Sequence, residues 1–255
     1  MLTTSLVVPC LHRVYSDHPM GSHKVHRSVG MSVKLADICR KLENLNREAI
    51  ELESPDRSVL VTFDDGWIDS IQFVDLFKRL TKLQPVLFLT VNQLKGDTSL
   101  LPLPRLYAWC DSQSLDTASI PTLGITREEL KSLPENLQHE VLDSLDIPRV
   151  HNSTELLQPE DIARLVDAGW IIGSHAHDHH DLRFDDAEEL EQGLKEALSE
   201  TANAGGVSWL AWPEGRCSVE LCEIASKVGF TRQFSLNVEA GMIEFPTLIH
   251  REIWS

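Results

Sequence analysis

The chain has 255 residues, 42% of them hydrophobic and 24% charged, which is enough for one large hydrophobic core or two small ones. No apolar run approaches the roughly 20 residues that cross a bilayer. The net charge of −16 disfavours nucleic acid and anionic membranes as partners, because like charges repel.

The N-terminal segment and the cysteines favour a cytoplasmic protein. Residues 1–14 (MLTTSLVVPCLHRV) carry no basic leader and no small-residue cleavage pattern, so we interpret their apolar stretch as a buried strand rather than a signal peptide. The five cysteines are scattered and form no CxxC pair. This pattern favours reduced, mostly buried thiols and a reducing compartment.

Apolar runs and helical patterns alternate along the first third of the chain. The predicted strands are 6–11, 58–63 and 85–90. The predicted helices are 33–51 and 68–80. The alternation then lapses, and we interpret residues 92–153, which include a charged helical stretch at 126–145, as a helical insertion.

The alternation resumes after the insertion. The predicted helices are 160–168, 185–201 and 219–228. The predicted strands are 170–174, 207–212 and 230–236, followed by a last apolar run at 246–253. Because strand and helix alternate without a GxGxxG or GxxxxGK[ST] loop, we predict a parallel sheet, closed or partly closed into a (β/α) barrel, in a single domain over residues 1–255.

Polar residues directly follow two of these predicted strands, where a (β/α) barrel carries its active site. Asp64 and Asp65 are adjacent carboxylates that repel each other when buried, unless a cation lies beside them. His175 and His179 are four residues apart, and on a helical turn this spacing places both imidazoles on one face. The alternatives without function are an Asp-Gly turn and an incidental surface tract of histidines.

Together, one carboxylate and two histidines predict a catalytic metal site with positions left open for water and substrate. One of the two aspartates, together with His175 and His179, is then expected to hold one divalent metal. Zinc is the first choice, and Co²⁺, Ni²⁺ or Mn²⁺ suit the same nitrogen and oxygen ligands.

Further candidates follow other predicted strands. A backbone N–H near Glu214 is a candidate to stabilise an oxyanion, although the loop can also serve packing alone. His250 is a candidate general acid, His12 follows the first strand in the same way, and both residues also suit structural roles. The insertion offers Arg105, Tyr107 and Trp109 for stacking on a sugar, unless it forms a dimer surface.

Three motifs resemble the polysaccharide deacetylases, carbohydrate esterase family four. VTFDDG at 61–66, IGSHAHDHHDL at 172–182 and LAWPEG at 210–215 match the family patterns TFDDG, H-[ST]-x-x-H-x-x-L and a-Y-P-y-G in order and spacing. PCLHRV, PEDIARLVDAGWIIGSHAHDH and KVGFTRQFS resemble further family segments, so the similarity covers most of the chain except about 92–153. The resemblance implies a distorted, TIM-like (β/α)7 barrel and metal-dependent N- or O-deacetylation.

The resemblance also implies roles for individual residues. It makes Asp64 the general base, and Asp65, His175 and His179 the metal ligands. Leu182 completes the histidine motif, which selects His179 over His180. The N–H of Glu214 then stabilises the oxyanion.

The chain departs from the family patterns at several positions. Ala176 replaces Ser or Thr, Trp212 replaces Tyr, and Glu214 replaces an aromatic residue. The arginine form of the third motif and a D-x-x-D-W motif are absent. LIHRE at 248–252 allows two interpretations, with His250 as the general acid or with Arg251 matching the l-P-R-i ending of another branch. The candidate substrate-binding residues are His12, Arg105, Trp109, Trp212 and Arg251.

We therefore predict a metal-dependent hydrolase that removes an N-acyl group, acetyl first, from a small or carrier-linked amino sugar in glycan biosynthesis. The alternatives are a deformylase or cyclic-amide hydrolase on the same scaffold and a non-enzymatic sugar-binding relative. Neither a nucleic-acid partner nor a membrane span is expected, and the sequence is compatible with a homo-oligomer.

Overall fold

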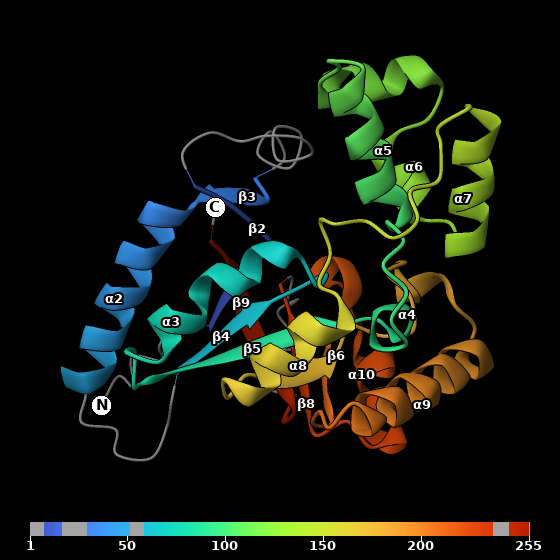
Figure 1. The fold of residues 1–255 in the computed structure, drawn as a ribbon. Helices are drawn as coiled ribbons and strands as arrows, with labels where there is room; N and C mark the ends of the chain where they lie inside the picture. The colour runs from blue at the N-terminus through green and yellow to red at the C-terminus, as the bar shows by residue number, and fades with distance from the viewer. Residues whose placement is uncertain (1–7, 17–29, 52–58, 237–244, 255) are drawn as a thin grey trace.

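A closed parallel barrel forms the centre of the computed structural model, which describes residues 8–16, 30–51, 59–236 and 245–254 (Figure 1). Its strands are β1 (Val8–Leu11), β4 (Val59–Phe63), β5 (Leu83–Leu89), β6 (Ile171–Ser174), β7 (Trp209–Ala211), β8 (Arg232–Ser235) and β9 (Leu248–Ile253). They neighbour one another in this order, and β9 pairs with β1 to close the ring. The predicted (β/α)7 barrel is confirmed. The least regular junction joins β6 to β7, where the described register pairs Ser174 with Leu210 alone.

Helices connect the strands and cover the outside of the barrel (Figure 1). The longer ones are α2 (Leu35–Glu51), α8 (Pro159–Asp167), α9 (Ala187–Asn203) and α10 (Val219–Val228). The short ones are η1 (Ile68–Phe73), α3 (Val74–Phe77), α4 (Val91–Leu94), η3 (Leu182–Phe184) and η4 (Pro213–Gly215). Apolar residues at helical spacing, such as Ile38, Leu42 and Leu45 of α2, face the sheet and are buried. None of the described helices combines the length and apolar composition needed to span a lipid bilayer.

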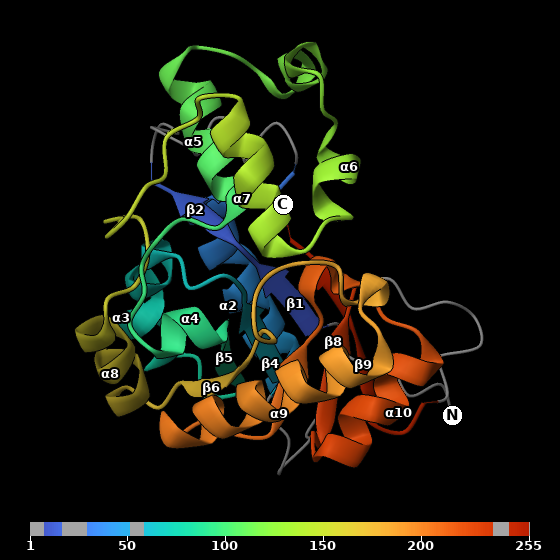
Figure 2. The same cartoon turned by 90° about the vertical axis from the view of Figure 1, so that its right-hand side faces the viewer.

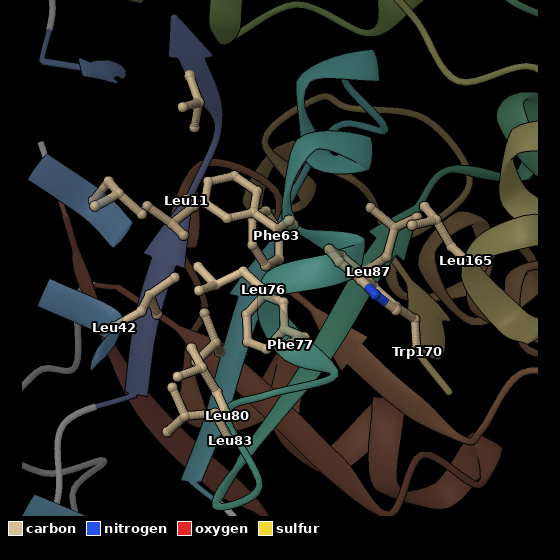
Figure 3. Close-up of a cluster of buried hydrophobic side chains, with 14 of the residues drawn as sticks. Leu11, Leu42, Phe63, Leu76, Phe77, Leu80, Leu83, Leu87, Leu165 and Trp170 are labelled. Carbon is tan, nitrogen blue, oxygen red and sulfur yellow. The ribbon is translucent and has the colours of Figure 1, made fainter. Parts of the chain in front are cut away.

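The largest hydrophobic cluster lies between the first barrel strands and the helices α2, α3 and α8 (Figure 3). The Phe63 ring packs against Trp170 and Phe77, with centroids 4.9 Å and 6.0 Å away. Such contacts between rings from separate elements fix the helices on the wall of the barrel. The ends of β4 and β5, at Phe63 and Leu89, therefore lie in a packed core.

The insertion between α4 and α8 forms its own group of helices, which stands above the barrel (Figure 2). These are α5 (Pro102–Ser112), η2 (Thr117–Leu123), α6 (Arg127–Lys131) and α7 (Glu135–Ser144). They enclose a separate cluster that includes Leu106, Leu130 and Leu142. The predicted helix at 126–145 is broken into α6 and α7. Pro134 lies between them and cannot continue a helix, because it lacks the backbone N–H.

Two local predictions were wrong. The predicted helix at 33–51 begins only at Leu35, since Ser32–Lys34 forms β3, which pairs with β2 (Arg13–Tyr15) in a small parallel sheet outside the barrel. The predicted helix at 68–80 is mainly the 3₁₀ helix η1. Residues 6, 7 and 58 of the predicted strands lie outside the described residues. All five cysteines are free as expected, and Cys39 alone among them is not buried.

Candidate functional site

The site lies at the ends of barrel strands, as the sequence predicts. One residue follows directly after each of the strands β4, β6 and β7, and its backbone N–H still donates a hydrogen bond to the neighbouring strand. These bonds run from Asp64 to the Leu11 carbonyl oxygen (3.0 Å), from His175 to Leu89 (2.7 Å) and from Trp212 to Phe234 (3.0 Å). The start of each site loop is therefore anchored to the barrel wall.

Asp65, His175 and His179 converge on one small space. Asp65 Oδ1 lies 3.4 Å from Nε2 of His175 and 3.3 Å from Nε2 of His179, and one donor atom from each residue falls within 4.8 Å of the others. Asp65 Oδ1 and His175 Nε2 are buried and have no hydrogen-bond partner among the described residues. Such orphaned atoms each cost about 1–3 kcal/mol. A divalent cation held by these three side chains would satisfy them, so the residues fit a metal of the zinc type.

Other groups orient these three ligands. The Nδ1–H of His175 donates to the carbonyl oxygen of Ala211 (2.8 Å). The indole N–H of Trp67 donates to Asp65 Oδ2 (3.3 Å), and the Gln93 amide donates to the Asp65 carbonyl oxygen (2.5 Å). These bonds turn Asp65 Oδ1 and His175 Nε2 toward the shared space. Sequence reasoning missed Trp67 and Gln93. The Thr-x-x-Gln pattern at 90–93 indicates only the capped start of α4.

Each of the three site loops contains a non-glycine residue with a left-handed backbone. The φ angles are 67° at Asp65, 65° at Ala176 and 56° at Glu214. The predicted helical turn at 175–180 is wrong, because the segment is a series of bends. The turn at Ala176, rather than helical spacing, brings the rings of His175 and His179 to a centroid distance of 4.8 Å. Such backbone strain concentrates at functional sites.

Asp64 lies beside this cluster with its own partners. Nη1 of Arg251 donates to Asp64 Oδ1 (2.7 Å), and the Cys10 thiol donates to Oδ2 (3.4 Å). Nε2 of His12 lies 3.9 Å from the same Oδ2. Burial by itself raises the pKa of Asp64, but the charge and hydrogen bond of Arg251 outweigh it, with a contribution from His175 and His12 when they are protonated, and lower the pKa to about 2. Asp64 is therefore ionised at neutral pH.

His250 and Arg251 point to opposite sides of β9, as neighbouring residues in a strand do. Arg251 is buried against Asp64, whereas the side chain of His250 is exposed. The structure therefore does not bring His250, the candidate general acid, to the site. The histidine that it brings there is His12, which lies directly beyond β1 and is 9% exposed.

Three candidate substrate-binding residues serve packing instead. The side chain of Trp212 is fully buried, and its indole N–H donates to Gln233 Oε1 (3.1 Å). Arg105 is buried inside the insertion and donates to the carbonyl oxygens of Pro148 and Ile147 and to Asp143. Trp109 is partly buried and packs on the hydrophobic cluster inside the insertion. The sequence showed aromatic and basic residues in the insertion but not which way they face.

Arg105→Ala is expected to lower the free energy of unfolding by about 3 kcal/mol, because the buried carbonyl oxygen of Ile147 and the partly buried one of Pro148 lose their donor. Urea denaturation measures this loss. The control is Arg149→Ala, which removes an exposed partner of the same Asp143 and costs about 1 kcal/mol or less. Unchanged stability of Arg105→Ala together with a raised KM would restore the sugar-stacking role.

Comparisons with known proteins agree with this geometry. The profile of the family "Polysaccharide deacetylase" matches residues 51–232, whereas no curated protein matches the chain. Among solved structures, BC0361, a polysaccharide deacetylase from Bacillus cereus, is 13% identical with a TM-score of 0.56, covering 97% of this chain and 64% of that one. The Streptococcus pyogenes deacetylase PplD in complex with acetate is 13% identical, with a TM-score of 0.56 and coverages of 98% and 93%.

A third structure, the de-N-acetylase from Aggregatibacter actinomycetemcomitans, is 13% identical, with a TM-score of 0.57 and coverages of 96% and 93%. At such identities these structures show a shared fold, and this chain spans less than two thirds of the Bacillus cereus protein. The matched profile covers more than half of the chain and includes the loops that carry Asp64, Asp65, His175 and His179. The chain therefore belongs to the polysaccharide deacetylase family.

Proposed function

We propose that the protein is a metal-dependent hydrolase that removes an N-acetyl group from an amino sugar. The observation that carries this proposal is the convergence of Asp65, His175 and His179, with orphaned buried atoms, beside the ionised carboxylate of Asp64. Zinc is the first choice for these ligands, and Co²⁺, Ni²⁺ or Mn²⁺ are alternatives. When bound, the cation polarises the acyl oxygen and lowers the pKa of a water toward about 7.

The first step needs a base, and Asp64 is suited to it. Its carboxylate accepts one proton from the attacking water, whose oxygen bonds to the acyl carbon. Arg251 keeps Asp64 ionised and holds Oδ1, while Oδ2 faces His12. The N–H of Glu214 is the proposed donor to the developing oxyanion.

The second step needs a proton on the leaving nitrogen, and we assign its delivery to His12. Burial lowers the pKa of His12, so the ring is neutral before reaction. Nε2 lies 3.9 Å from Asp64 Oδ2, so a small movement of the two side chains would bring them into hydrogen-bond distance for His12 to take over the proton. His12 then passes this proton to the nitrogen, the C–N bond breaks, and acetate and a free amine are released.

We infer that the substrate is a small or carrier-linked amino sugar of a cytoplasmic glycan pathway. The proposal draws on the family and on two neighbours of the same fold, one named as a de-N-acetylase and one solved with acetate. The fold itself does not distinguish acetyl from formyl groups or sugars from other amides.

Screening acetylated and formylated amino sugars, free and nucleotide-linked, tests the proposal when metal content and released acid are measured together. Acetate and amine in equal amounts, lost with a chelator and restored by Zn²⁺, are expected. Formate alone would identify a deformylase. Sugar binding without any acid release, in protein that contains metal, would identify a non-enzymatic relative.

A further inference from the structure

The insertion touches the candidate active site through the short helix α6. The ammonium group of Lys131 contacts the carboxylate of Glu214 in the loop after β7. Glu128, one turn earlier, accepts a hydrogen bond from Arg216 (3.0 Å), and Arg216 also donates to Asp181 (3.3 Å). Figure 2 shows α6 above the barrel, over the side that carries β8 and β9. One helix of the insertion is thus linked to the site loops after both β6 and β7.

Glu214 stands between this helix and the predicted metal ligand His179. One carboxylate oxygen of Glu214 takes the contact from Lys131, and the other, Oε1, lies 3.9 Å from Nδ1 of His179. The second nitrogen of the same ring, Nε2, faces Asp65 Oδ1 at 3.3 Å. The two ring nitrogens of His179 therefore face two different carboxylates. Nε2 faces Asp65, which is a predicted metal ligand, and Nδ1 faces Glu214, which is not.

A histidine ligand needs a defined tautomer. The nitrogen that binds metal must be free of a proton, and a carboxylate or carbonyl near the other nitrogen holds the proton there and sets the ring angle. For His175 this group is the carbonyl oxygen of Ala211, fixed by the barrel. For His179 the group on the matching side of the ring is the Glu214 carboxylate, which at 3.9 Å attracts the Nδ1 proton by its charge rather than through a hydrogen bond. This carboxylate belongs to a loop side chain and is free to rotate unless it is held.

Lys131 supplies the charge that holds Glu214 in place. Their side chains are only 11% and 13% exposed, so water and salt screen this pair weakly. Without Lys131, the carboxylate would gain hydration by turning outward and away from His179.

We propose that Lys131, acting through Glu214, positions His179 for metal binding, so that the insertion is part of the support of the metal site. Lys131 is a positioning residue, since it contacts none of the three ligands itself. The inference rests on the proposed metal-dependent function, and it predicts that the loss of one lysine from the insertion weakens metal binding in the barrel.

The test compares Lys131→Met with Lys131→Arg and with Lys95→Met. Lys95 pairs with Glu196 (2.6 Å) and offers the loss of a lysine from a more exposed ion pair. Competition with a chromophoric chelator measures zinc affinity, and circular dichroism checks the fold. We expect zinc to bind about 10- to 100-fold more weakly to Lys131→Met, and near wild-type affinity for the other two variants.

Two further measurements separate positioning from a general loss of structure. The Lys131→Met, Glu214→Gln double variant should bind zinc no more weakly than Glu214→Gln alone, because both residues act through one contact. Saturating zinc should restore most of the kcat of Lys131→Met. Nitrogen NMR of metal-free protein should show a mixed His179 tautomer in this variant and one tautomer in the wild type.

Wild-type zinc affinity in Lys131→Met would overturn the inference and leave the proposed function standing. Absence of zinc binding by the wild-type protein would instead overturn the proposed function. Should Lys131→Met fail to fold, Glu214→Gln takes its place, and unchanged zinc affinity in that variant would contradict the role of the bridge.

Discussion

Asp64→Asn is expected to lower kcat by about 10²–10⁴-fold while the protein still binds one metal ion. The amide keeps the shape of the carboxylate but cannot accept the proton of the attacking water. Metal should remain because Asp64 is not among the three side chains whose donor atoms converge in the candidate site. Steady-state kinetics with an acetylated amino sugar and metal analysis of the same sample measure both quantities.

Asp65→Asn is the matched control, one residue further along the same loop. It removes the carboxylate oxygen that faces both His175 and His179, so metal and activity should be lost together. The assignment of base and ligand fails if Asp64→Asn keeps full activity. If Asp64→Asn loses its metal instead, Asp64 is a ligand rather than the base.

His12→Gln is expected to lower kcat for an N-acetyl substrate by about 10²-fold or more, because the leaving amine then lacks its proton donor. His250→Gln should change kcat by less than about twofold, since that side chain is exposed on the opposite face of its strand from Arg251. The two substitutions are chemically identical, so each serves as the control for the other.

The leaving group provides a second, independent measurement. An aryl acetate releases a stable phenolate that needs no proton, so His12→Gln should retain far more of its activity on this ester than on the amide. A variant that is merely misfolded would lose amide hydrolysis and ester hydrolysis equally. Loss of amide hydrolysis in His250→Gln, with full activity in His12→Gln, would restore His250 as the general acid.

The sequence predicted the barrel well because its strands are short apolar runs bounded by polar turns. It also pointed to Asp65, His175 and His179, whose donor atoms converge in the structure, since polar residues that follow parallel strands meet at one end of the barrel. Their convergence depends on buried packing between helices and strands, and this packing follows the apolar pattern that can be read from the chain. The role of Asp64 as the base stays a prediction.

The remaining parts of the site depend on backbone geometry that the residue pattern does not contain. Neighbouring residues of β9 alternate between two faces, and the pattern alone did not show whether His250 or Arg251 points inward. The left-handed turn at Ala176 replaces the expected helical turn, although alanine favours helices. Arg105 resembles a surface residue in sequence, yet it is buried and bonds to α7 and to the loop that follows α7.

The ion pair between Arg251 and Asp64 joins residues that are 187 positions apart, and its arginine comes from the strand that closes the ring. On the ribosome, every other part of the candidate site is made before this strand emerges. The nascent chain therefore holds an incomplete ring and an unsupported carboxylate until β9 has been synthesised. We therefore expect hydrolytic activity to appear only after β9 has joined the ring.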